Sequence, residues 1–207
     1  MLLRAINKKI LTVVMLMNKI LFLGYGRSKT RVINELEKRD CSVNIHNDKV
    51  SLDDVDDSHL IVSFGYRHIL GTDFINKCGC PIVNLHMSYL PFNRGAHPNF
   101  WSFYDGTQSG VSIHLIDEGM DTGPILFQKK TQFEDEKTFI ETYDRLFNEI
   151  ENLFIENIDL IISKKWIAKK QVEKGTSHLV KDLPKEFKGW QSSIAYEIKR
   201  LKKLKKY

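Results

Sequence analysis

The chain has 207 residues, 42% of them hydrophobic and 28% charged, which excludes a disordered or fibrous protein. At ~150 residues per domain, this length predicts one domain with an appendage, or two small domains. No apolar stretch approaches the ~18 residues that a membrane-spanning helix needs. The chain has 3 cysteines, and this odd, sparse set argues against a secreted disulfide scaffold and favours the reducing cytoplasm.

The net charge of +5 comes from one end of the chain. Residues 198–207 hold six of the 31 basic side chains and no acidic one, which leaves 25 basic against 26 acidic residues elsewhere. The body therefore has a charge of −1, and nucleic acid is not the expected partner of this protein.

The N-terminal residues 1–16 resemble a signal peptide only in part. Their apolar stretch, Ile10–Met17, is short, and no small-residue cleavage site follows it. We expect an N-terminal extension over 1–16, or translation that begins at Met17, before a catalytic domain over 17–165.

Strand and helix patterns alternate along this domain. A strand over 17–26 precedes a helix capped by Ser28, a half-buried strand around 41–45 and an acidic loop. The later predictions are a strand at 60–64, a helix that is capped by Thr72 and ends near Gly79, and a strand at 81–86. A helix from Pro98 to about Tyr104, strands at 111–115 and 125–128, and one long helix over 136–163 follow. This alternation predicts an α/β sheet with helices on both faces.

The last part of the chain, 166–207, has a different character and is expected to be a C-terminal extension. It contains fewer apolar residues, and it ends in a predicted basic amphipathic helix. We expect this helix to dock on the body or on a second subunit, with contact to a membrane surface as the alternative. Its apolar positions are Ile194, Ile198, Leu201 and Leu204.

Two cofactor signals are weak. Gly24 and Gly26 follow a strand as in a dinucleotide-binding motif, but the third glycine would fall at Lys29, so a tight turn is favoured over a nicotinamide or flavin site. Cys78 and Cys80 lack the partners of a zinc site, and no metal is expected.

The strongest chemical signal is Asn84-x-His86 at the end of a predicted strand. Two residues apart on a strand, both side chains project to one face. They would lie at the carboxyl end of the sheet, where open α/β sheets bind ligands. An amide and an imidazole side by side can both stabilise one developing oxyanion.

A second signal is the segment 116–124, Ile-Asp-Glu-Gly-Met-Asp-Thr-Gly-Pro, between two apolar strands. Its glycines let the backbone approach a ligand closely. A carboxylate here, such as Asp121, can orient a histidine or accept a proton. On its own, the segment is more typical of a solvated acidic turn.

These motifs together resemble the folate-dependent formyltransferase family over residues 17–165. The resemblance is carried by Asn84-x-His86-x-Ser88-x-Leu90-Pro91, by Arg94-Gly95 and by Asp121-x-Gly123. Residues 91–99 and Gly175-Thr176-x-His178 are most similar to enzymes that formylate dTDP-linked 4-amino-4,6-dideoxy sugars. The resemblance implies a Rossmann-like, mostly parallel twisted sheet, 10-formyltetrahydrofolate as co-substrate, and Asn84, His86 and Asp121 as catalytic residues.

The resemblance also implies two sets of binding residues. The donor set is Phe64, Gly65, Tyr66, His68, Ile69, Leu70, Asp117, Glu118, Gly119 and Met120. The acceptor set is Arg94, Gly95, Asn99 and Trp101, with the Arg94 guanidinium neutralising a pyrophosphate. We expect His46, His59 and His114 to be structural or surface residues.

The expected function is cytoplasmic N-formylation of a nucleotide-linked amino sugar for lipopolysaccharide O-antigen or other surface-glycan synthesis, by a chain that can form a homodimer. The length argues against the further C-terminal domain of the tRNA-modifying members and against tRNA as substrate. Three alternatives are left open: glycinamide ribonucleotide or another small amine as acceptor, a non-catalytic nucleotide-binding module, and an RNA-associated protein that acts through its basic tail.

Overall fold

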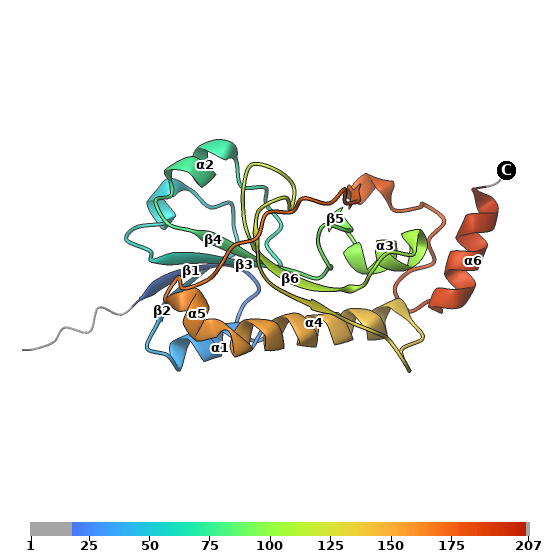
Figure 1. Cartoon of the computed structure of the whole chain (residues 1–207), viewed down its shortest axis with the longest axis horizontal. Coiled ribbons are helices and arrows are strands. Elements are labelled where there is room, and N and C mark those ends of the chain that lie inside the picture. The colour runs from blue at the N-terminus through green and yellow to red at the C-terminus, as the bar shows by residue number, and fades with distance from the viewer. Residues whose placement is uncertain (1–17, 206–207) are drawn as a thin grey trace, which may run out of the picture.

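The computed structural model describes residues 18–205, and Figure 1 shows how its elements are arranged. The expectations for 1–16 and for a start at Met17 lie outside the described residues. Between residues 18 and 205, no helix combines the length and the apolar character needed to cross a bilayer.

A six-stranded sheet forms the centre of the molecule, in the order β2-β1-β3-β4-β6-β7. The first four strands in this order are parallel, and β6 and β7 run antiparallel to their neighbours. The predicted α/β fold with a mostly parallel sheet is therefore confirmed. The strands are β1 (Lys19–Gly24), β2 (Ser42–His46), β3 (Leu60–Phe64), β4 (Ile82–His86), β6 (Gly110–Leu115) and β7 (Ile125–Lys130).

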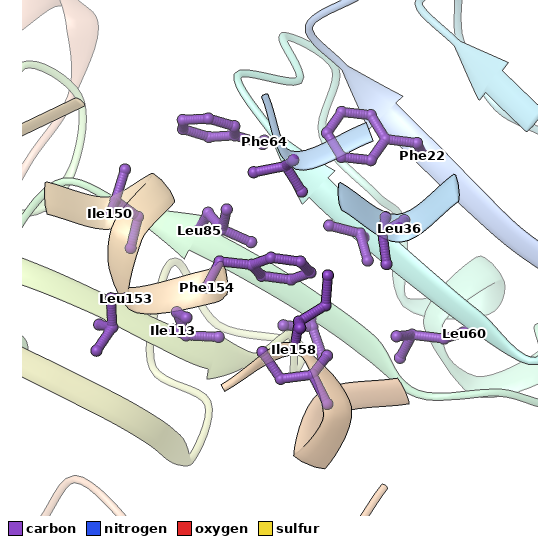
Figure 2. Packing of buried hydrophobic residues seen from close by; sticks show 14 of the residues in the cluster. Phe22, Leu36, Leu60, Phe64, Leu85, Ile113, Ile150, Leu153, Phe154 and Ile158 are labelled. Carbon is purple, nitrogen blue, oxygen red and sulfur yellow. The ribbon is translucent and has the colours of Figure 1, made fainter. Parts of the chain in front are cut away.

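Helices cover both faces of the sheet, because the central strands are apolar on both sides. On one face, α1 (Val32–Glu37), α4 (Phe139–Glu156) and α5 (Ile158–Ile162) bury the largest hydrophobic cluster. Figure 2 shows Phe154 and Ile158 of these helices in one cluster with Phe22, Leu60 and Leu85 of the strands. The opposite face packs against α2 (Thr72–Lys77) through a second cluster.

The C-terminal segment returns across the molecule to a third cluster. In Figure 1 its orange and red ribbon runs from α5 past β5 (Arg94–Gly95) to α6 (Ile194–Leu204). On the way it adds β8 (Ser177–His178), which pairs with β5. Leu201 of α6 is buried against Phe100 of α3 (Pro98–Asp105), so the basic helix docks on its own chain. Two short 3-10 turns, Leu52–Asp54 and Val180–Asp182, complete the described elements.

Three local predictions were wrong at helix ends. Ser28 lies in a turn, and α1 begins after Arg31, with the Thr30 hydroxyl accepting from the amide of Val32. Thr72 is the first residue of α2, whose N-cap is Gly71. The predicted helix over 136–163 is divided at Asn157, whose side chain donates to the carbonyl of Leu153 and competes with continued helix geometry.

Phe154 is expected to be the most costly truncation on the α4 face. It is fully buried, so Phe154→Ala removes apolar contacts and leaves a cavity, at a cost of about 3–5 kcal/mol in the free energy of unfolding. Urea denaturation measures this cost, with Leu160→Ala as control because Leu160 is 43% exposed. Equal losses for both variants would contradict this packing.

Candidate active site

Three polar side chains meet at the carboxyl end of β4. Asn84 and His86 project from the same face of the strand, and both reach Asp121 in the loop between β6 and β7. Asn84 Nδ2 lies 3.4 Å from Asp121 Oδ1, and His86 Nδ1 lies 3.6 Å from Asp121 Oδ2. The structure thus brings together the three residues predicted to be catalytic.

Asp121 is held in place by backbone contacts. The amide of Gly95 donates to Asp121 Oδ2 at 2.8 Å, and the Gln171 side-chain amide donates to the carbonyl of Asp121 at 2.9 Å. Its φ of 52° is in the left-handed region, which asparagine and aspartate tolerate better than most residues. The carboxylate therefore has a fixed direction toward the end of β4.

The environment of Asp121 keeps it ionised. Burial favours the neutral acid and would raise the pKa of Asp121, but the His86 and His114 rings and the Gly95 amide outweigh burial. The pKa of Asp121 is therefore held well below its ordinary value. A fixed negative charge lies beside the imidazole of His86.

Burial works against the protonation of His86. Burial lowers the pKa of His86 below its ordinary value of 6.5, and His114 acts in the same direction. Asp121 and the carbonyl of Asn93, 3.4 Å from His86 Nε2, oppose this shift without reversing it. The neutral ring can still donate one N–H to a ligand.

His114 is a site residue that the sequence analysis missed. It lies on β6 directly opposite Asn84 in the antiparallel pair and is 1% exposed. Its Nδ1 lies 2.8 Å from the carbonyl of Leu115, and its Nε2 lies 3.1 Å from Asn84 Nδ2 and 3.4 Å from Asp121 Oδ1. His114 therefore fixes the plane of the Asn84 amide. A strand pattern alone contains no signal for this pairing.

Two hollows adjoin the three residues. The central pocket, of about 270 Å³, includes Asn84, His86 and Asp121 in its walls. The loop cavity, of about 340 Å³, shares Tyr66, Asn84 and Asp121 with it. All ten residues predicted to bind the donor line one of the two: Phe64 and Gly65 line the central pocket, Tyr66 lines both, and the loop cavity takes His68, Ile69, Leu70, Asp117, Glu118, Gly119 and Met120.

The residues predicted to bind the acceptor are dispersed. Gly95 lines the central pocket. Arg94 donates to Gln171 at 2.7 Å. Asn99 is 4% exposed, and its amide donates to the carbonyl of Phe139. Trp101 stacks on His178 with ring centroids 3.7 Å apart, away from both hollows.

The C-terminal extension completes the wall beside His86, which the sequence analysis also missed. Thr176 accepts from the amide of Asn93 through its hydroxyl and donates to the Asn93 side chain. Asn93 is 1% exposed, has a φ of 56°, and presents its carbonyl to His86. Gly95 is required beside it, because a Cβ there would lie 2.4 Å from the carbonyl of His178.

A third hollow, the aromatic cavity, has a volume of about 470 Å³. It shares Met87 and Pro98 with the central pocket. Its other lining residues are Tyr25, Arg67, His97, Asn99, Phe139, Ile140, Tyr143 and Trp190.

Potential metal ligands do not cluster in the described part of the chain. Between residues 18 and 205, no group of three or more His, Cys, Asp or Glu side chains is arranged to hold a metal ion. Cys78 donates to the carbonyl of Cys80, and both thiols are free.

The fold and the site define a Rossmann-like α/β protein with a polar trio at the carboxyl edge of its sheet. The sequence profile of the formyl transferase family matches residues 4–158. The formyltransferase PseJ from Anoxybacillus kamchatkensis, solved in complex with UDP-4,6-dideoxy-4-formamido-L-AltNAc and tetrahydrofolate, is 36% identical, with a TM-score of 0.80 over 86% of this chain and 96% of that chain.

Two curated relatives match more locally. A dTDP-4-amino-4,6-dideoxyglucose formyltransferase of Mycobacterium bovis is 33% identical over 123 residues, which is 59% of this chain and 52% of the relative. A methionyl-tRNA formyltransferase of Fusobacterium nucleatum is 37% identical over 116 residues, which is 56% of this chain and 37% of the relative. The chain thus spans about half of the first relative's length and about a third of the second's.

The chain belongs to the formyl transferase family, because the family profile covers most of its length. This confirms the family predicted from the Asn84, His86 and Asp121 motifs, including its similarity to sugar N-formyltransferases.

Proposed function

We propose that the chain transfers a formyl group from 10-formyltetrahydrofolate to the amine of a nucleotide-linked amino sugar, such as dTDP-4-amino-4,6-dideoxyglucose. The observation that carries this proposal is the position of Asn84, His86 and Asp121 in the central pocket, which shares lining residues with each of two larger hollows. Two substrates can then meet at one polar centre. The folate and nucleotide-sugar product bound to the relative PseJ support this choice of donor and acceptor.

The donor occupies the loop cavity in this proposal. Backbone groups of 117–121 offer hydrogen bonds to the polar edge of a pterin ring, and apolar side chains offer contact with its faces. Ile69 is 92% exposed and Met120 is 41% exposed at this cavity, which is unusual for large apolar side chains without a ligand. The formyl group then points to the central pocket, since Asn84 and Asp121 border both hollows.

The reaction begins when the neutral amine attacks the formyl carbon. A new bond forms between that carbon and the amine nitrogen, the carbon–N10 bond to the folate breaks, and negative charge develops on the formyl oxygen in between. The amine loses one proton and N10 gains one, so the step balances. Asp121, ionised and close to His86, is placed to carry that proton, directly or through water.

Asn84 and His86 stabilise the developing oxyanion in this proposal. The Asn84 amide donates one hydrogen to His114, and its contact with Asp121 is long at 3.4 Å. A formyl oxygen can take over this second hydrogen, because long hydrogen bonds of an unliganded site often rearrange when substrate binds. Each donor to an oxyanion typically contributes about 3–4 kcal/mol in the transition state.

The cellular setting is also part of the proposal. We expect the protein to act in the cytoplasm on precursors of lipopolysaccharide O-antigen or another surface glycan, as a monomer or homodimer. A gel-filtration measurement of the purified chain, compared with its mass of 24.1 kDa, tests the dimer.

A turnover screen tests the proposed reaction. The protein is mixed with 10-formyltetrahydrofolate and, in separate reactions, with dTDP- and UDP-linked 3-amino and 4-amino sugars or glycinamide ribonucleotide. Release of tetrahydrofolate is followed by absorbance, and the formamide by mass spectrometry. We expect formylation of at least one nucleotide-linked amino sugar. Turnover with glycinamide ribonucleotide alone, or folate binding without any turnover, would contradict the proposal.

A further inference from the structure

The segment 169–178 of the C-terminal extension is attached to the site loops at both of its ends. At its start, Lys169 forms an antiparallel bridge with Ile125, the first residue of β7. At its end, β8 pairs with β5. Two residues after Lys169, the antiparallel direction of the bridge brings Gln171 opposite Gly123. The side chain of Gln171 is therefore placed beside the loop between β6 and β7.

The side-chain amide of Gln171 uses all of its hydrogen-bonding capacity. Its Nε2 donates to the carbonyl of Asp121 at 2.9 Å and to the carbonyl of Gly123 at 2.7 Å. Its Oε1 accepts from Nε and Nη2 of Arg94 at 3.1 Å and 2.7 Å. A side-chain amide has two N–H donors and one oxygen with two lone pairs, and each of these is engaged. Gln171 therefore has one orientation, in which it bridges the loop of Asp121 and the strand of Arg94.

These contacts hold Asp121 at two points. Gln171 binds its backbone carbonyl, and the amide of Gly95 donates to its carboxylate at 2.8 Å. Because Gly95 follows Arg94 in β5, the four residues form a closed ring of hydrogen bonds and covalent links. The φ of Asp121 is 52°, in the left-handed region that residues other than glycine keep where their surroundings enforce it. The ring supplies this support.

We propose that Gln171 is a positioning residue, which directs the Asp121 carboxylate toward His86 by clamping the Asp121 loop to Arg94. This inference rests on the proposed function, in which Asp121 carries a proton, and it deepens it by assigning part of the site to the C-terminal extension. Gln171 lines none of the three hollows, so its effect on the reaction passes through Asp121. Asp121 Oδ2 lies 3.6 Å from His86 Nδ1, and a displacement of the loop by ~1 Å would break this contact.

Steady-state kinetics test this role through two variants of Gln171. Gln171→Leu keeps the approximate size of the side chain and removes its hydrogen bonds. We expect its kcat to fall about 10- to 100-fold, because a misplacement of ~1 Å at an active site can cost ~100-fold in rate. Gln171→Glu still accepts from Arg94, but it turns a carboxylate toward the carbonyls of Asp121 and Gly123. It should lose a similar factor, because the contact with Arg94 alone does not hold the loop.

A second glutamine provides the matched control. Gln108 lies in the loop between α3 and β6, is also partly buried, and donates to a backbone carbonyl, that of Ser109, at 2.8 Å. Gln108→Leu should keep the wild-type kcat and KM values. The Gln171 variants should keep the wild-type KM for the acceptor, and their low rates should persist at saturating donor, since the proposed role concerns the proton path. Circular dichroism verifies that each variant is folded.

NMR titration of His86 gives a readout that does not depend on formyl transfer. The titratable groups that face His86 are Asp121, which favours the protonated imidazole, and His114, which opposes it together with burial. Gln171→Leu should therefore lower the pKa of His86, in the same direction as Asp121→Asn. In the Asp121→Asn background, Gln171→Leu should cause no further shift, because the charge that Gln171 positions is already absent.

Three results would overturn the inference. A folded Gln171→Leu variant with wild-type kcat would show that the clamp does not act on the reaction. A low kcat with the wild-type pKa of His86 would show that the loss has another origin. A rate restored by saturating donor would assign Gln171 to folate binding. Failure of the proposed function is a separate observation, because it appears as absence of turnover in wild-type protein, while the titration of His86 still reports where Asp121 lies.

Discussion

The His86→Asn variant is expected to turn over about 100- to 1000-fold more slowly than the wild-type protein, and Asn84→Ala is expected to lose a similar factor. Both side chains project from one face of β4 into the central pocket, where the formyl oxygen would develop its charge. Each variant removes one donor from that charge and leaves the sheet core untouched. Initial rates at saturating donor and acceptor measure the effect.

A histidine outside the site is the control for this experiment. His59 precedes β3 at the opposite end of the sheet, and its Nε2 lies 2.7 Å from the carbonyl of Ile162. His59→Asn should keep the wild-type rate. Near-normal rates for both His86→Asn and Asn84→Ala under saturating conditions would reject the oxyanion role.

Asp121→Asn is expected to lower turnover by about 100-fold or more, with little change in the affinity for donor or acceptor. Asparagine keeps the shape of the side chain and can still accept from the amide of Gly95. The negative charge and the proton-accepting group are lost. Rates at saturation and separate donor titrations measure the two effects.

The same variant should change the titration of His86. Asp121 favours the protonated imidazole, so its removal should lower the pKa of His86 further below 6.5. At any given pH, a smaller fraction of His86 is then protonated than in the wild-type protein. NMR titration of the histidine Cε1–H signals follows this shift, with His86→Asn identifying the signal of His86.

A competing hypothesis makes 117–121 a donor-binding loop without a proton role. In that case Asp121→Asn should weaken folate binding, and saturating folate should restore the rate. Restoration would refute the catalytic assignment. A low rate at saturation, together with normal donor affinity, would support it.

The fold class and the family of this protein could be predicted from its sequence, because the patterns that indicate them are local. Short, mostly apolar segments such as Leu60–Phe64 are typical of buried strands in a sheet that is covered on both faces. Two-residue spacing placed Asn84 and His86 on one face of a strand. The motifs around Asp121 and Gly95 were enough to predict the formyl transferase family.

The sequence could not show which strands are neighbours. His114 was expected to be a structural or surface residue. It lies in the site because the register between β6 and β4 places His114 opposite Asn84. Trp101, expected in the acceptor site, is 6% exposed and is covered by His178 of the C-terminal extension. Both outcomes depend on contacts between segments that are distant in the chain.

The end of α4 and the position of Trp190 also depend on hydrogen bonds that the sequence pattern does not reveal. The Asn157 side chain ends α4 by donating to the carbonyl of Leu153, which apolar spacing over 136–163 does not reveal. Trp190 faces a cavity because Ile140 anchors its segment on the start of α4. Periodicity reports the environment of a residue along its own element, whereas the partner across space depends on sheet order, register and loop closure, which only the folded chain establishes.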